Sequence, residues 1–394
     1  MESEEIIDKG IEGENFVTKL AETSYLKYWC YPNPMDMGGD KKEICDLLIL
    51  FFDTAIIISV KNYNVNGNYE RFLKRVVEKS SKQLFGAQRK LFSSKEIVLQ
   101  HILQGDRKFE PNDYKHIFKI TVSVGEDFEN YDFIDHDQVK GTVNIFNRQT
   151  FEAIIFEFDT IKDLTEYLIA REELLIANKG LCCNCNEKDL IAQYLMNARE
   201  FPEELLKDFE NFTKSLQGKW QRYHANKDVI LKKIEEENSY FIDRLVKTDV
   251  LPLENGELLA KEFMTMSRFE RRIMANSLFE LVNKYEGNQD VLARRYTVFN
   301  GIGFLFVYYP IERDEKEIDA ILFSAQQLYS YFKKDNKIVM LAASRGMKQW
   351  KFGLFQATEM TDGAEKYLQA LALQFGWFQN EKRVERNIKE YPNE

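Results

Sequence analysis

Two apolar runs separated by only two residues constrain the fold of this chain more than any other feature. The first run is Leu47–Phe52 and the second is Ala55–Val60, with Asp53 and Thr54 between them. Each run has the length of a strand, and apolar residues do not alternate with polar ones, which is typical of strands buried on both faces. The pattern therefore predicts a tight β-hairpin that other elements cover on both sides.

Further elements are predicted on both sides of this hairpin. Apolar residues at steps of three to four, with charges between them, indicate a helix over residues 4–22. A strand over residues 25–31 is predicted next, ended by Pro32 and Pro34. After the hairpin we expect a long helix over 69–92, strands over 116–124 and 142–146, and a helix over 161–177.

The rest of the chain is predicted as a helical region followed by a second α/β region. From residue 189 to about 290 the sequence is rich in Glu, Lys, Leu and Phe at helical spacing. The expected C-terminal elements are a strand or hairpin over 295–310, a helix over 315–334, a strand over 337–344, a short strand over 352–356 and a helix over 363–375. The predicted class is α/β, with a mixed-sheet domain over 1–178, a helical linker or partner region over 179–290 and a smaller α/β domain of sensing or interaction type over 291–394.

Composition and charge exclude several classes of protein. The chain has 394 residues, of which 44% are hydrophobic and 30% charged, so it can build sizeable cores and is not expected to be disordered. The formal net charge is −10. An acidic chain is not a general binder of polyanions, so contact with nucleic acid would need a local basic surface.

The sequence also predicts a compartment. No apolar stretch approaches the roughly 20 residues of a membrane helix. The acidic start, Met1–Glu5, lacks the basic segment of a signal peptide, and the count of five cysteines is odd. We expect a cytoplasmic protein that does not enter a membrane.

Charged residues stand where the two buried strands end. Asp46 precedes the first strand and Lys61 closes the second, while Ser59 shares the strand face of Lys61 because side chains alternate. A turn at Asp53 and Thr54 would place residue 46 about opposite residue 61. Inward charges at the end of a buried hairpin are costly unless they pair with each other or bind something, so this end is a candidate site.

In this arrangement the chain resembles the restriction-endonuclease-like superfamily, known by its PD-(D/E)xK motif, over about residues 4–178. Asp46 matches the first carboxylate of the motif, with Cys45 in place of the proline, and Lys61 matches the lysine. Glu14 matches a carboxylate that the first helix often supplies, and Gln83 resembles a glutamine on the helix after the lysine. The segments 29–34 and 43–46 are also similar to a group of uncharacterised bacterial proteins.

The resemblance implies hydrolysis of phosphodiester bonds with Mg²⁺ or Mn²⁺ as cofactor. Asp46, Glu14 and the carbonyl of Val60 would hold the metal, which prefers oxygen ligands. Lys61 would orient the attacking water or stabilise charge on the phosphate. Members with an extra domain are often bacterial antiviral defence or DNA-processing enzymes, so the resemblance favours DNA over RNA. One site cuts one strand, so double-strand cleavage would favour a homo-oligomer.

Ser59 is a departure from the motif, because the family carries its second acid at this position. A hydroxyl is a poor substitute for a carboxylate at a divalent cation. Glu14 is the first candidate to take over the role of that acid, and Asp53 and Glu43 are weaker ones. The alternatives are a degenerate nuclease-fold module that binds nucleic acid or a protein partner, and a purely structural ion pair between Asp46 and Lys61.

Two other features of the sequence bear on binding. On the helix predicted at 69–92, four basic residues recur at helical spacing: Arg71, Arg75, Lys79 and Lys82. Together with Gln83 they would form a surface that can bind a phosphate backbone. Three cysteines lie within Cys182–Cys185, but structural zinc needs four ligands, so reduced thiols are the simpler interpretation. We expect an activating partner or ligand to act at the C-terminal region.

Overall fold

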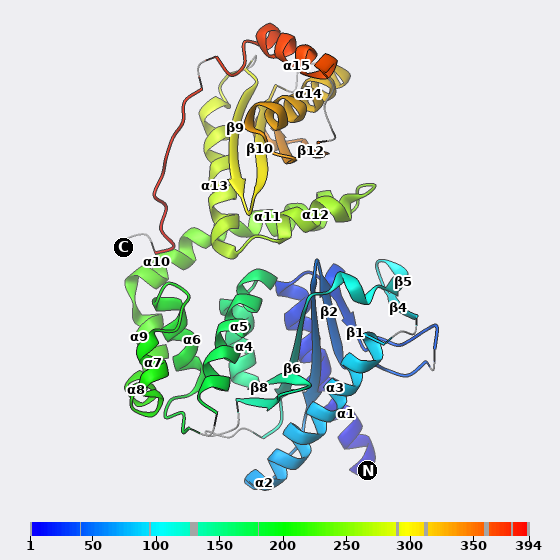
Figure 1. Cartoon of the computed structure of the whole chain (residues 1–394), viewed down its shortest axis with the longest axis vertical. Helices are drawn as coiled ribbons and strands as arrows, with labels where there is room; N and C mark the ends of the chain where they lie inside the picture. The colour runs from blue at the N-terminus through cyan, green and yellow to red at the C-terminus, as the bar shows by residue number, and fades with distance from the viewer. Residues whose placement is uncertain are drawn as a thin grey trace. The chain divides into compact units, whose positions relative to one another are not determined.

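The structure is a computed structural model, and it describes residues 2–39, 41–93, 96–126, 133–179, 181–288, 291–310, 314–357, 362–379 and 381–391. The chain forms two compact units, Met1–Asn226 and Lys227–Glu394 (Figure 1). Each unit combines helices with a β-sheet, so the predicted mixed α/β class is confirmed. The boundary between the units falls inside the helical region predicted over 179–290.

The described part of the first unit is built on a six-stranded mixed sheet. Its strands, in spatial order, are β1 (Cys30–Pro32), β2 (Leu47–Phe51), β3 (Thr54–Lys61), β6 (His116–Ser123), β8 (Gly141–Asn147) and β7 (Ile134–Asp137). β1, β2 and β3 are antiparallel neighbours, β3, β6 and β8 run parallel, and β7 is antiparallel to β8. The predicted hairpin is thus present, and every residue of β2 and β3 is buried, as strands covered on both faces must be.

Helices cover the two faces of this sheet. One face carries Leu48, Leu50 and Ile57, and α3 (Lys79–Leu91) packs on it. α1 (Glu2–Ser24) packs on the other face, where Val60 lies beside it. Because strand side chains alternate, Ser59 and Lys61 point to the α3 face.

The register of the hairpin differs from the predicted one. The turn consists of Phe52 and Asp53, because Phe51 pairs with Thr54 and Leu47 with Ile58. Phe52 adopts a left-handed backbone with φ of 52°, as tight hairpin turns require. This register places Asp46 opposite Ser59 rather than Lys61, and Lys61 lies two residues further along the same face.

Other segments of the first unit also differ from the prediction. Instead of a strand over 25–31, a short 3₁₀ helix (η1, Lys27–Trp29) precedes β1, and the imidazole of His101 contacts the carbonyl oxygens of Lys27 and Cys30 at 3.2 and 3.0 Å. These tertiary contacts override the local strand preference. The sequence also did not indicate the hairpin of β4 (Ile97–His101) and β5 (Gly105–Phe109), the strand β7 or the helix α4 (Arg148–Glu157).

The helix predicted over 69–92 is continuous but not uniformly α-helical. It consists of α2 (Tyr69–Phe72), a π-helical segment (η2, Leu73–Glu78) and α3. A π turn contains an extra residue, so side chains before and after it do not keep ideal α-helical phase. The first unit ends with further helices: α5 (Ile161–Ala177), α6 (Glu187–Met196), α7 (Glu203–Lys207), α8 (Phe209–Leu216) and α9 (Lys219–Ala225).

The second unit begins with helices and continues into a four-stranded sheet in its described residues. The helices are α10 (Lys227–Glu236), α11 (Tyr240–Leu245), α12 (Gly256–Met264) and α13 (Arg268–Tyr285). The strand order is β12 (Trp350–Gln356), β11 (Lys337–Ser344), β10 (Ile302–Tyr309) and β9 (Ala293–Phe299), with only β10 and β11 parallel. α14 (Glu315–Lys333) and α15 (Asp362–Phe375) pack on one face of this sheet.

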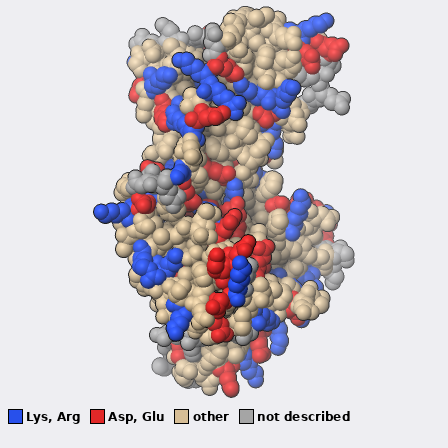
Figure 2. All heavy atoms as spheres, turned by 60° about the vertical axis from the view of Figure 1, so that its left-hand side comes forward, with Lys and Arg blue, Asp and Glu red and all other residues tan. Residues whose placement is uncertain are grey.

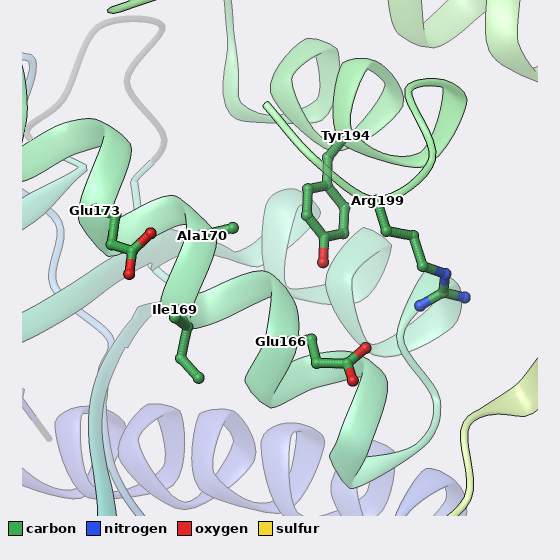
Figure 3. Close-up of a pocket in the computed structure, with 6 residues that line it drawn as sticks. All are labelled: Glu166, Ile169, Ala170, Glu173, Tyr194 and Arg199. Atoms are coloured by element: carbon green, nitrogen blue, oxygen red, sulfur yellow. The ribbon is translucent and has the colours of Figure 1, made fainter. Parts of the chain in front are cut away.

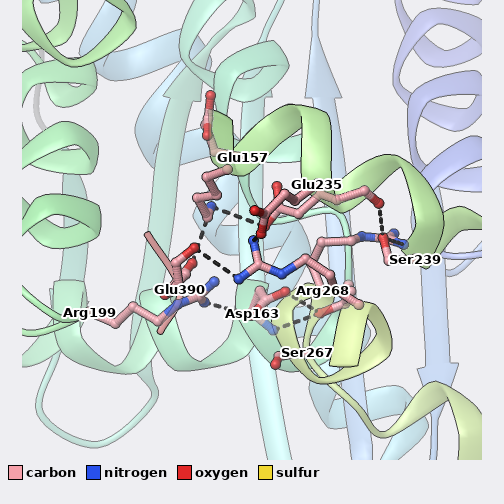
Figure 4. A network of polar contacts seen from close by, with 12 residues as sticks. Glu157, Asp163, Arg199, Glu235, Ser239, Ser267, Arg268 and Glu390 are labelled. Carbon is pink, nitrogen blue, oxygen red and sulfur yellow. Dashed lines mark hydrogen bonds and ion pairs between the residues drawn. The ribbon is translucent and has the colours of Figure 1, made fainter. Parts of the chain in front are cut away.

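Buried arginines tie the helices of the second unit together. Arg268 and Arg271 on α13 both bond the carboxylate of Asp243, at 2.7 and 2.6 Å. Arg268 also donates to Ser239 Oγ at 3.2 Å, and both residues are labelled in Figure 4. Buried guanidinium groups must be paired in this way, so we assign these arginines a structural role. In the described part of the chain, no helix combines the length and apolar character needed to span a membrane.

Candidate active site

Asp46 directly precedes β2, and residues near the end of β3 donate hydrogen bonds to its carboxylate. Its Oδ2 accepts hydrogen bonds from Ser59 Oγ at 3.2 Å and from the main-chain N–H of Val60. Both contacts follow from the observed register, which sets Asp46 opposite Ser59. Ser59 therefore orients Asp46, a role that differs from that of the motif's second acid.

Lys61 completes this end of the hairpin. Its Nζ lies 3.8 Å from Asp46 Oδ2 and donates to the carbonyl oxygen of Val60 at 3.1 Å. The side chain is only 9% exposed, so its ammonium group is held in place by protein contacts. The predicted meeting of Asp46 and Lys61 thus appears in the structure.

Glu14 reaches this group from α1. Burial and the neighbouring Asp46 carboxylate raise the pKa of Glu14, whereas Lys61 and a hydrogen bond from Asn33 lower it. Gly13 allows the helix to come this close, because a Cβ at that position would lie 2.6 Å from Val124 Cγ2 and 3.4 Å from Val60 Cγ1. A close helix–strand approach at Gly13 therefore positions Glu14 near Asp46 and Lys61.

Glu43 is a fourth member of the group. The segment before β2 pairs with the segment after β1, through a bridge between Met35 and Glu43. Desolvation raises the pKa of Glu43 to about 7, with contributions from the Asp46 charge and from a hydrogen bond between the two carboxyl groups. Such a hydrogen bond forms only when one of the two carboxyl groups carries a proton, because two carboxylates at this distance repel each other. Asp53, by contrast, lies in the turn at the opposite end of β3.

The group carries more negative than positive charge. Asp46 lies beside Lys61, and Glu14 and Glu43 interact electrostatically with both, so full ionisation would leave an excess of two negative charges. This donor set, carboxylates with the Val60 carbonyl nearby, is of the all-oxygen kind that Mg²⁺ prefers. Within the described ranges, no group of three or more His, Cys, Asp or Glu side chains is arranged to hold a metal ion. The carboxyl groups instead bond to one another and to protein donors.

The backbone that carries Lys61 is braced by the segment after β6. The N–H groups of Val124 and Glu126 donate to the carbonyl oxygens of Lys61 and Tyr63, at 2.9 and 3.1 Å. The Glu126 carboxylate accepts from the main-chain N–H groups of Val65 and Gly67 at 2.7 and 2.5 Å. These contacts fix the loop from β3 to α2 and therefore the end of β3.

The close approach at Gly13 gives a first prediction. Gly13→Ala is expected to lower the free energy of unfolding, because overpacking against Val124 costs about 1–3 kcal/mol and outweighs a helix-propensity gain of about 1 kcal/mol. Gly86→Ala on α3 is the matched control, since a Cβ there would meet only Arg89 Nη2 at 4.0 Å. Urea denaturation should show destabilisation for Gly13→Ala and stabilisation for Gly86→Ala. Equal stabilisation of both variants would contradict the close approach.

Most of the predicted basic residues lie on the solvent side of the helix after β3. Arg75, Lys79, Lys82 and Gln83 are exposed, and Arg71 is partly buried. Lys79 Nζ donates to Tyr63 Oη at 3.0 Å, which places this lysine beside the loop after Lys61. The π-helical segment contains Arg75, so Arg71 and Arg75 do not keep ideal helical phase with the later residues. Binding of nucleic acid by these residues stays a prediction.

The charge distribution agrees with a net acidic chain. Figure 2 shows acidic side chains gathered in the lower half of the face it draws, with lysines and arginines around them. No general affinity for polyanions is expected from such a face.

A shallow pocket lies elsewhere in the first unit. It has a volume of about 260 Å³ and is lined by residues of α5 and α6 and by Arg199 (Figure 3). Arg199 Nη1 is paired with the buried carboxylate of Asp163 at 2.6 Å (Figure 4), so its charge is balanced. The residues of this pocket offer no nucleophile or metal-ligand cluster, and we place the candidate site at the end of β3.

Comparison with known proteins gives no relative for this chain. No protein-family model matches it, and neither the curated proteins nor the solved structures contain a match. The residues around Lys61 are therefore the basis for assigning a function.

Proposed function

We propose that the chain is a metal-dependent nuclease that hydrolyses phosphodiester bonds of DNA, with its active site at the end of β3. The observation that supports this proposal is the buried amine of Lys61 3.8 Å from Asp46, with Glu14 and Glu43 near enough to interact electrostatically with both. An excess of acidic groups around one ammonium group is costly in a purely structural site. The same arrangement suits a divalent cation and a phosphate that binds beside it.

Each residue of the site has a proposed role. Asp46 and the Val60 carbonyl, together with Glu14 and Glu43, would hold Mg²⁺ or Mn²⁺ only after these carboxyl groups move from the positions that they occupy in the structure, where they bond to one another and to protein donors. The bound metal would polarise the scissile phosphate and lower the pKa of the attacking water. Lys61 would stabilise the negative charge that develops on the phosphate oxygens. Ser59 would keep Asp46 oriented by the hydrogen bond that it donates.

The order of elements supports a restriction-endonuclease-like domain. A helix, an antiparallel set of strands ending at Lys61, a helix and a parallel strand follow one another from α1 to β6. Fold alone does not establish function, so this likeness adds to the argument from the site. Double-strand cleavage and a role in bacterial antiviral defence, with assembly into a homo-oligomer, extend the same proposal.

Metal-dependent cleavage of plasmid DNA tests the proposal. The full chain should convert supercoiled plasmid to nicked or linear forms with Mg²⁺ or Mn²⁺, and chelation by EDTA should stop the reaction. Asp46→Asn, which keeps the size of the side chain, should be inactive although it binds the same DNA. Cleavage that is equal in the wild type and in Asp46→Asn would indicate a contaminating nuclease and would refute the assignment.

The hydrogen bond from Ser59 to Asp46 favours a second candidate function, a non-cleaving module on the same fold. In that case Ser59 and Lys61 would only satisfy a buried carboxylate, and the exposed basic residues near Lys79 would bind nucleic acid. The two functions separate in the same assay. A module would retard plasmid DNA in a gel at low salt and leave it uncut with every metal tried.

A further inference from the structure

Two thiols lie in contact in a part of the first unit that the proposed nuclease site does not use. The sulfur atoms of Cys183 and Cys185 are 3.8 Å apart, and both side chains are partly exposed. Cys183 Sγ also lies 3.6 Å from the carbonyl oxygen of Cys185. The two side chains therefore face the same side of a short loop between α5 and α6.

The loop that carries the thiols is fixed by hydrogen bonds to α8. The main-chain N–H of Asn184 donates to Thr213 Oγ1 at 3.0 Å, and the Asn184 side-chain amide donates to the carbonyl oxygen of Glu210 at 2.9 Å. Gln217 Nε2 donates to the carbonyl oxygen of Asn184 at 2.6 Å. Because Asn184 lies between the two cysteines, these contacts hold both thiols in place.

The surroundings distinguish the two thiols by their pKa. Hydrogen bonds with Cys185 lower the pKa of Cys183, whereas burial and the charge of Glu187 raise it, and the charge of Arg171 adds a smaller lowering. Cys185 has a raised pKa, because its thiol is hydrogen-bonded to Cys183 and is buried. The loop also leads directly into the positive end of α6, whose N-cap is Asn186. Thiolate character and partial exposure together make a cysteine reactive.

Cys182 is in a different situation. It is exposed, and its Sγ contacts Asn184 Oδ1 at 3.6 Å. The contacting pair alone supplies half of the four ligands that structural zinc takes. Exchange chemistry needs only an attacking and a resolving thiol, and Cys183 and Cys185 provide both.

We propose that Cys183 and Cys185 form a thiol–disulfide exchange site that reacts with low-molecular-weight disulfides. The Cys183 thiolate attacks one sulfur of the reagent, whose S–S bond breaks and releases one thiolate, and a mixed disulfide forms. Cys185 loses its proton to solvent and attacks the Cys183 sulfur, which releases the second thiolate. The protein loses two electrons and two protons, and the reagent disulfide is reduced to two thiols.

Oxidised glutathione and intact-mass spectrometry of the full chain test this proposal. The wild type and Cys182→Ser should both lose two hydrogen atoms without an adduct. Peptide fragmentation of Cys182→Ser should place the bridge between Cys183 and Cys185 and leave the buried Cys30 and Cys45 as free thiols. Cys185→Ser should instead accumulate one glutathione on Cys183, located by peptide fragmentation. Cys183→Ser should react more slowly than Cys185→Ser.

Three outcomes would overturn the proposal. The first is the absence of any mass change in the wild type under conditions that modify the urea-unfolded chain. The second is a bridge that requires Cys182, which would be absent in Cys182→Ser. The third is an adduct in Cys185→Ser that lies on Cys182. None of these outcomes bears on DNA cleavage, so the two proposals fail independently.

Discussion

Lys61→Met is expected to reduce the rate of DNA cleavage about 10²–10³-fold, the usual cost of losing one group that stabilises transition-state charge. Methionine is similar in length to lysine and fills the buried space, but it removes the ammonium group 3.8 Å from Asp46 Oδ2. The phosphate oxygens would then develop charge without a cationic side chain beside them. Initial rates of plasmid nicking at saturating Mg²⁺ measure this effect.

Lys115→Met is the matched control for this variant. Lys115 is exposed and directly precedes β6. The start of β6 pairs with Thr54, the first residue of β3, whereas Lys61 is the last residue of that strand. The control therefore makes the same change of net charge far from the site. Equal rates of plasmid nicking for Lys61→Met and Lys115→Met would show that Lys61 has no role in catalysis.

Stability must be followed in the same experiment, because Lys61 also neutralises buried carboxylates. Removing one partner of a buried pair is destabilising by about 3–5 kcal/mol when the remaining charge is uncompensated. The cost should be smaller here, since the pKa of Glu43 is already raised to about 7 and this carboxyl group can take up a proton when the ammonium group is removed. A melting curve with Mg²⁺ present shows whether the variant is folded at the assay temperature.

The hairpin and the main helices could be predicted from the sequence because their signals are local. The runs Leu47–Phe52 and Ala55–Val60 are apolar throughout, and only a strand buried on both faces suits them. The helix predicted over 161–177 has the bounds of α5, and Thr160 caps it by accepting from the N–H of Asp163. Spacing and capping act within a few residues of one another, so the chain itself carries this information.

Two features could not be predicted from such local signals: the register of the β2–β3 hairpin and the presence of Glu43 in the site around Lys61. The register depends on the left-handed backbone of Phe52, a residue type that does not signal such a turn. A shift of two residues keeps every side chain on its face, so apolar patterning cannot detect it. Glu43 joins the site through pairing with the segment after β1, and the sequence offered it only as a weaker candidate.

The short 3₁₀ helix before β1 shows how distant contacts override local preference. Residues 25–31 have strand-like composition, yet His101, more than seventy residues away, contacts two carbonyl oxygens of this segment. The hairpin of β4 and β5, which supplies His101, had no clear sequence signal of its own. An error in one element therefore led to an error in the other.

Glu43→Gln is expected to lower the cleavage rate on the order of 100-fold, comparable to losing one stabilising group in an active site, and to raise the Mg²⁺ concentration needed for half-maximal rate. Glutamine resembles protonated glutamate in shape and can keep a hydrogen bond to Asp46, but it cannot become a charged ligand. If Glu43 only shares a proton with Asp46, the variant should cleave like the wild type. Glu96→Gln, at an exposed glutamate, is the control for loss of one charge.

The double variant Glu43→Gln/Ser59→Asp tests whether Glu43 has taken over the role of the second acid. Residue 59 faces Asp46 in the hairpin register, so an aspartate there brings a carboxylate back beside the Asp46 carboxylate. The double variant should recover most of the lost rate and the low Mg²⁺ requirement.

Ser59→Asp alone should lower the melting temperature without metal, because like charges then face each other across β2 and β3. Added Mg²⁺ should restore stability by binding the folded state. A Ser59→Asp variant that neither rescues Glu43→Gln nor gains stability from Mg²⁺ would show that no cation binds between residues 46 and 59. The carboxyl groups around Lys61 would then require a different explanation.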